Sequence, residues 1–110
     1  MKASEIRFNI ELDDENVPEK IFWQATDTGN KLEETKSVSL SIWDHVQKES
    51  LRIDLWAKDM PMHEMKRFYI DTIGGLANSL QSSTGDEYMA KEMNKLCNKL
   101  IEHLKKEYPS

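Results

Sequence analysis

The hydrophobic period of the chain changes at one place, and this change constrains the fold more than any other feature. From Leu51 to Trp56 apolar and polar residues alternate, which is the period of two of a half-buried strand. After Asp59 apolar residues recur every three or four positions, as on one face of a helix. Asp59 is the expected N-cap of that helix, and Pro61 is expected in its first turn. A strand therefore runs into a long helix, and both apolar faces need cover.

Three further segments show the alternation of a strand. They are residues 5–12, 20–26 and 36–44, and they precede the strand at 50–57. The residues expected on the covered face are Ile6, Phe8, Ile10, Leu12, Ile21, Trp23, Ala25, Val38, Leu40, Ile42, Leu51, Ile53 and Leu55. The polar stretch 27–35 is interpreted as a mobile hairpin loop.

The last two strands are expected to form an antiparallel hairpin, and two turns fit it. A two-residue turn pairs Val46 with Glu49, and a four-residue loop pairs Asp44 with Glu49. Both place the apolar residues of the two strands on the same face, so the sequence leaves the choice open.

Two helices are expected after the strands. The first spans about residues 61–82 and contains Gly74 and Gly75, which we interpret as a site of close packing, with a flexible hinge as the alternative. The second spans about 86–107, and Thr84 and Glu87 fit a capping box at its start.

These elements predict an α+β fold with a two-layer ββββαα architecture. One four-stranded antiparallel sheet, at about 4–57, would carry the two C-terminal helices on one face. Strands of about 26 Å and helices of about 31 Å have matching lengths. The chain of 110 residues is expected to form a single domain.

Charge and hydropathy exclude several classes of partner. The net charge of −5 belongs to the first half: up to Asp59 there are 13 acidic and 8 basic residues, and beyond it 7 of each. Nucleic-acid binding is therefore disfavoured. The sequence shows no signal-peptide pattern and no apolar window that could span a membrane, so we expect a soluble, cytoplasmic protein without direct membrane insertion.

The sequence shows no pattern typical of catalysis or metal binding. His63 and Glu64 suggest a zinc-protease helix, but Arg67 stands where the second histidine would be needed. The single cysteine, Cys97, falls on the apolar face of a helix and is expected to be a buried small hydrophobe. We therefore predict that the protein is not an enzyme and that it has no catalytic residues, metal or cofactor.

Outward-facing aromatic residues are the most informative candidates for a site. Trp43 and Trp56 have the opposite parity to the inward residues of their strands, and Phe22 is expected on the same side. With the two-residue turn, Trp43 would face Arg52, whose guanidinium would stack on the indole. One interpretation is a cross-strand pair that only stabilises the sheet. The other is an interaction surface formed by Trp43, Trp56, Arg52 and Phe22.

Two runs of sequence resemble a known family. SEIRFNIELDDENVPEKIFWQATD at 4–27 and LSIWDHVQKESLRIDLWAKDMPMHEMKRFY at 40–69 are similar to the gliding motility-associated protein C family of Bacteroidetes. The resemblance implies a small cytoplasmic accessory protein of gliding motility without known catalytic residues. Its partners would be other gliding-apparatus proteins, or a second copy through the open sheet face or an edge strand.

A second hypothesis is a small-ligand-binding module or an undetected enzyme. Its pocket would lie between the helices and the sheet, lined by Met60, Met62, Met65 and Trp23.

Overall fold

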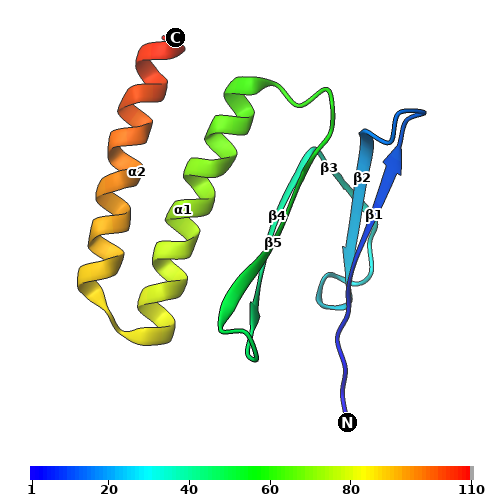
Figure 1. Cartoon of the computed structure of the whole chain (residues 1–110), viewed down its shortest axis with the longest axis horizontal. Coiled ribbons are helices and arrows are strands. Elements are labelled where there is room, and N and C mark those ends of the chain that lie inside the picture. The colour runs from blue at the N-terminus through cyan, green and yellow to red at the C-terminus, as the bar shows by residue number, and fades with distance from the viewer. Residues whose placement is uncertain (110) are drawn as a thin grey trace. The chain divides into compact units, whose positions relative to one another are not determined.

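The computed structural model describes residues 1–109 and has the predicted α+β class. The elements are β1 (Ile6–Leu12), β2 (Pro18–Ala25), the 3₁₀ helix η1 (Thr26–Thr28), β3 (Glu33–Thr35), β4 (Ser37–Asp44), β5 (Glu49–Trp56), α1 (Met62–Thr84) and α2 (Glu87–Glu107) (Figure 1). The chain divides into two compact units, Met1–Met60 with all the strands and a second unit from Pro61 on with both helices. The expectation of a single domain stays a prediction, and so does the packing of the helix pair on a sheet face.

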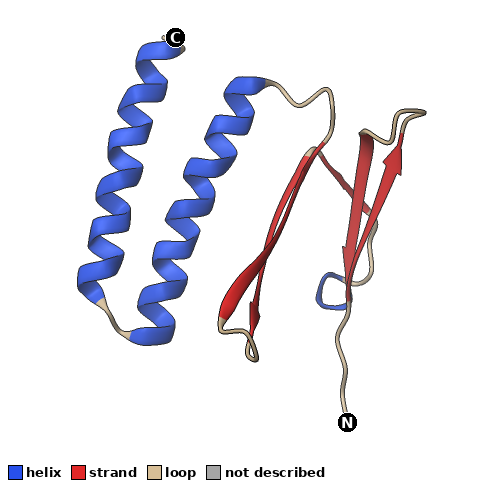
Figure 2. Cartoon of the chain, viewed as in Figure 1, coloured by secondary structure: helices blue, strands red, loops and turns tan. Residues whose placement is uncertain are grey.

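The strands form two antiparallel sheets, so the predicted single four-stranded sheet is wrong. One sheet has the order β1-β2-β3 and the other consists of β4 and β5 (Figure 2). The segment 33–44 changes partner at Lys36: its first part, β3, pairs with β2, and its second part, β4, pairs with β5. β3 lies in the stretch that was expected to be a hairpin loop.

Local hydrogen bonds interrupt the ladder at the point where the partner changes. The Thr35 hydroxyl donates to the Ser37 carbonyl at 3.2 Å, so it competes with sheet pairing there. The Lys36 carbonyl accepts from the Ala57 N–H at 2.8 Å, and the Lys58 N–H donates to the Pro18 carbonyl at 3.0 Å. The segment that leaves β5 is thus tied to the start of β4 and to the start of β2.

Within each sheet the predicted faces are confirmed. Phe8 pairs with Trp23 and Ile10 with Ile21 in β1 and β2. In β4 and β5 the pairs Val38–Leu55, Leu40–Ile53 and Ile42–Leu51 gather the apolar side chains on one face. Ile21 is fully buried, with Ala25 and Ala57 also buried, and these residues form the core of the first unit.

The hairpin between β4 and β5 has the four-residue loop. Asp44 pairs with Glu49, and the Asp44 carboxylate accepts from the N–H groups of Val46 at 2.9 Å and Gln47 at 3.1 Å. Lys48 takes a left-handed conformation, with φ of 60°. The side-chain bonds of Asp44 favour this loop over the two-residue turn.

The two helices of the second unit pack through small and apolar residues. Ile70 and Ala77 of α1 are buried, as are Ala90 and Cys97 of α2. α1 continues through the glycine pair without a break, and a Cβ at Gly74 would lie 3.9 Å from the Cys97 sulfur. Gly74 therefore lies where α1 approaches α2, in agreement with the packing interpretation.

Both predicted helix caps are wrong. The N-cap of α1 is Pro61, and Asp59 instead pairs with Lys36 at 3.1 Å. The N-cap of α2 is Asp86, whose carboxylate accepts from the Met89 N–H at 2.9 Å. Thr84 is the last residue of α1, and its hydroxyl accepts from the Asp86 N–H.

Candidate functional site

One face of the β4–β5 hairpin gathers three of the four predicted site residues. The register pairs Trp43 with Ser50, Ser41 with Arg52, Ser39 with Asp54 and Ser37 with Trp56, so all these side chains point to the same side. We call these eight residues the tryptophan face. The side chains of Trp43 and Trp56 are 60% and 52% exposed.

A hydrogen-bonded network occupies the centre of the tryptophan face. The Arg52 guanidinium bonds both carboxylate oxygens of Asp54, at 2.8 and 3.2 Å, as well as the hydroxyls of Ser39 and Ser41. The Ser39 hydroxyl also donates to Asp54 at 2.7 Å. The Arg52 hydrogen bond, followed by that of Ser39, lowers the pKa of Asp54. The centre is therefore a fixed polar cluster with an ionised carboxylate at neutral pH.

The pairing of the strands separates two residues that were expected beside the indoles. Arg52 faces Ser41 and not Trp43, because the four-residue loop shifts the register by two residues relative to the two-residue turn. Phe22 lies on β2, in the other sheet, where it pairs with Asn9 and Glu34. Parity along one strand tells only which side of its own sheet a residue takes, so it does not bring Phe22 to the tryptophan face.

The Trp56 end of the tryptophan face adjoins an apolar depression that sequence analysis missed. It has a volume of about 430 Å³ and is lined by Val17, Pro18, Asp54, Leu55, Trp56 and Lys58. Pro18 is the first residue of β2 and Val17 precedes it, and the Lys58 N–H holds Pro18 beside the end of β5. The sequence of the VPEK turn does not predict this depression, because the depression depends on contact with the distant segment that follows β5.

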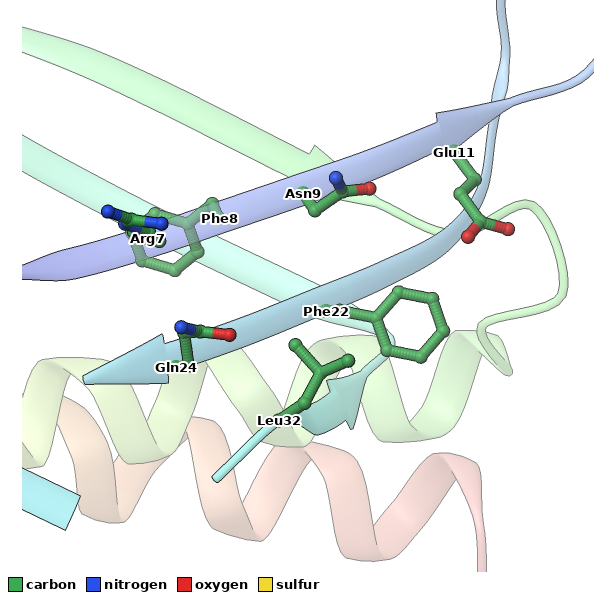
Figure 3. Close-up of a pocket in the computed structure, with 7 residues that line it drawn as sticks. All are labelled: Arg7, Phe8, Asn9, Glu11, Phe22, Gln24 and Leu32. Carbon is green, nitrogen blue, oxygen red and sulfur yellow. The ribbon is translucent and has the colours of Figure 1, made fainter. Parts of the chain in front are cut away.

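Phe22 contributes to a second, open depression on the polar face of β1 and β2. Its volume is about 470 Å³, and its lining residues are Arg7, Phe8, Asn9, Glu11, Phe22, Gln24 and Leu32 (Figure 3). The polar side chains of β1 follow one another along its edge in this view. Leu32 comes from the stretch between η1 and β3, which was expected to be only a loop.

The remaining candidates do not form a chemical site. Within residues 1–109 no group of three histidine, cysteine or acidic side chains is placed to hold a metal ion. His63 lies against the Tyr108 ring at 5.5 Å, and His103 lies 3.3 Å from Glu107. Cys97 is buried, as predicted, and its thiol donates to the Ile70 carbonyl at 3.7 Å.

Neither α1 nor α2, the two long helices of the described chain, is apolar enough over a sufficient length to cross a bilayer.

The chain is similar to one known protein family. The model of the family described as gliding motility-associated protein GldC-like matches residues 18–106. The chain belongs to the GldC-like family. No curated protein and no solved structure gives a match.

Family membership confirms the resemblance noted in the sequence and associates the chain with gliding motility. In this GldC-like chain the matched range contains the whole tryptophan face, all of α1 and α2 up to residue 106, and it begins after β1. The ligand pocket expected between helices and sheet, with Met60, Met62, Met65 and Trp23, involves both units and stays a prediction.

Proposed function

We propose that this protein is a non-enzymatic cytoplasmic accessory factor of gliding motility that binds another component of the gliding apparatus through its tryptophan face. The observation that carries the proposal is the exposure of Trp43 and Trp56 on one face of β4 and β5. Membership of the GldC-like family supplies the process. Tryptophan and arginine are the residues most enriched among those that dominate binding energy at protein interfaces.

The spacing of the two indoles favours a protein partner over a small ligand. Trp43 and the residue paired with Trp56, Ser37, lie six positions apart on β4. At the rise of an antiparallel strand this separation is about 20 Å. A surface that contacts both rings must have the dimensions of a protein interface, which buries about 800 Å² on each partner.

The polar cluster between the indoles supports a defined binding geometry. Arg52 is held by Asp54, Ser39 and Ser41, so little side-chain entropy remains to be lost when a partner contacts it. The first unit also carries the whole charge excess of −5. A neutral or basic partner surface is therefore favoured over an acidic one.

Trp43→Ala and Trp56→Ala test the proposal in gliding cells. We expect each variant to keep its melting temperature within a few degrees, to accumulate normally, and to reduce colony spreading together with recovery of the wild-type partner. Tyr88→Ala is the matched control, because Tyr88 is an exposed aromatic residue, 72% accessible, on α2. Normal spreading and normal partner recovery in both tryptophan variants would refute the proposal, and so would unfolding of both.

A further inference from the structure

β1 presents an unpaired edge. Among residues 1–109 it pairs with β2 alone. The Thr26 N–H donates to the Glu5 carbonyl at 3.0 Å, and the Glu5 N–H donates to the Thr26 hydroxyl at 3.0 Å, so Glu5 takes the place of a hydrogen-bonded pair with Thr26. Because such pairs alternate along an antiparallel ladder, the peptide groups of Ile6, Phe8 and Ile10 point outward from the sheet.

β1 has only part of the protection that is usual for an edge strand, namely the charges of Arg7 and Glu11. Its sequence, IRFNIEL, contains neither lysine nor proline. The only irregularity in its pairing falls between Glu11 and Leu12, at the end of the strand. Ile6 and Leu12 are 68% and 50% exposed. An edge with these features is suited to accept another strand.

The order of side chains along β1 makes the strand complementary to itself in one antiparallel register. If Asn9 lies opposite Asn9 of the partner subunit, Phe8 lies opposite Ile10 of the partner subunit on the apolar side. On the polar side, Arg7 lies opposite Glu11 of the partner subunit, and the two-fold axis repeats this ion pair. The two Arg7–Glu11 pairs and the two Phe8–Ile10 pairs therefore form at the same time. Just beyond the strand, Glu5 lies opposite Asp13 of the partner subunit, whose charge is offset by Lys58.

The neighbouring registers pair the charged residues of β1 less well. A two-fold axis at Phe8 places Arg7 opposite Asn9 of the partner subunit, so no ion pair forms within the strand. An axis at Ile10 leaves Glu11 opposite Asn9 of the partner subunit and sets Arg7 opposite Asp13 of the partner subunit, whose carboxylate is already bonded to Lys58 and to the turn. A shift by a single residue turns the apolar side of one strand onto the polar side of the other. The register at Asn9 alone pairs Arg7 with Glu11 of the partner subunit.

The hydrogen bonding of the edge agrees with the same register. Phe8 and Ile10 both point their peptide groups outward, so they would form the hydrogen-bonded pair across the axis. Arg7, Asn9 and Glu11 would occupy the non-hydrogen-bonded positions, where opposed side chains lie closest. Arg7 is now paired with Glu5 at 3.0 Å, but both side chains are largely exposed, so this ion pair is readily exchanged.

We propose that two copies of this chain associate through β1, antiparallel about a two-fold axis at Asn9, so that two three-stranded sheets become one sheet of six strands. This surface differs from the tryptophan face, which stays available for another partner. The order of charges in β1 identifies the occupant as a second copy, because each end of the strand supplies what the other end requires.

Charge exchange tests the ion pairs across the axis. In sedimentation equilibrium of the full chain we expect a dimer for the wild type. R7E and E11R should each weaken it about tenfold or more, because each places like charges opposite one another. The double variant R7E/E11R restores both pairs and should return the dissociation constant to near the wild-type value. K31E, a charge reversal away from the edge on an exposed side chain, is the matched control.

A cysteine at the axis tests the register. N9C should form a disulfide-linked dimer under mild oxidation, because opposed Cα atoms at a non-hydrogen-bonded position lie about 4.5 Å apart, within disulfide range. Q24C, on the same face of the central strand β2, should stay monomeric on denaturing gels, as should the wild type, whose Cys97 is buried. A wild-type chain that remains monomeric at millimolar concentration overturns the proposal. So does a dimer that R7E and E11R leave intact, or a folded N9C that does not cross-link.

Discussion

Asp13 shows how much a single carboxylate organises in this chain. One of its oxygens accepts from the N–H groups of Glu15 at 2.8 Å and Val17 at 3.0 Å, and the other bonds the Lys58 ammonium at 3.0 Å. It thereby closes the turn between β1 and β2 and attaches that turn to the segment after β5. The Val17 bond first, and then Lys58, lower the pKa of Asp13 below its ordinary value of 3.8.

This shift predicts a contribution to acid unfolding. Because the folded-state pKa lies below the unfolded value, the carboxylate stabilises the fold above about pH 4 and loses this effect as the pH falls through the folded pKa. Asp13→Asn keeps an oxygen acceptor for the turn but removes the charge. We expect its urea midpoint to fall less steeply between pH 4 and 2 than that of the wild type. Equal slopes for the two proteins would contradict the assignment.

Two glycines of the helix pair should respond to alanine in opposite directions. At Gly75 a Cβ meets nothing within 4 Å, so Gly75→Ala should stabilise α1 by about 1 kcal/mol. At Gly85 the backbone has φ of 74°, which disfavours any side chain, so Gly85→Ala should destabilise by about 1 kcal/mol. Urea unfolding followed by circular dichroism at 222 nm measures both. A destabilising Gly75→Ala would contradict this prediction, because it would mean that another segment packs too closely against α1 at Gly75 to leave room for a methyl group.

The caps show why residue-level prediction from sequence is limited. From the sequence alone, Thr84 with Glu87 fits a capping box as well as Asp86 fits the N-cap that accepts from the Met89 N–H. What decides between them is Gly85, which ends α1 in the left-handed conformation and keeps Thr84 inside that helix. The N-cap of α2 therefore moves past the glycine to Asp86. The end of one helix, and not the start of the next, fixes this position.

At the scale of elements, local periodicity was sufficient for most of the fold. The four predicted strands and two predicted helices all occur, with ends displaced by one or two residues. The predicted faces of the strands are also correct, because the alternation of apolar and polar residues along a strand can be read directly from the sequence. The change of partner at Lys36 was missed because no glycine or proline marks it. β3 was missed because its residues, Glu33 to Thr35, show no apolar alternation.

The candidate site was predictable to the same degree. Trp43, Arg52 and Trp56 share a face because their parity within one hairpin is a local property. Phe22 was misplaced because its position depends on which strands share a sheet, and that is decided by contacts between distant segments. The depression beside Trp56 was not predictable for the same reason.

Arg52→Lys tests whether the polar cluster orders the tryptophan face. A lysine ammonium lacks the planar fork that reaches Asp54, Ser39 and Ser41 together. We expect a melting temperature lower by a few degrees and weaker binding of the gliding partner, although the charge is unchanged. Lys20→Arg, a substitution between the same two residue types on β2 of the other sheet, is the control. Unaltered stability and binding in Arg52→Lys would show that the cluster has no ordering role.

At the scale of the whole molecule, the uneven distribution of charge restricts what the chain can bind. Up to Met60 the acidic residues outnumber the basic ones by five, and beyond it the two kinds are equal in number. Several of the basic side chains are also engaged by carboxylates: Lys36 by Glu34 and Asp59, and Lys58 by Asp13 and Glu19. Binding to a polyanion requires a cluster of cations that can replace its counterions, and these pairs reduce the cationic surface further.

We therefore expect no measurable binding to a labelled DNA duplex in fluorescence anisotropy at 0.15 M salt, and no cosedimentation with vesicles that contain phosphatidylserine. Lowering the salt should not induce binding, because at low ionic strength the repulsion between the acidic first unit and an anionic surface grows with the Debye length. The variant E33K/E34K removes the acidic excess of β3 and provides a sensitised control, which should show weak binding at low salt if charge is the factor that excludes polyanions. Binding of the wild type that strengthens as salt is removed would contradict this prediction and would reveal a basic surface on the chain.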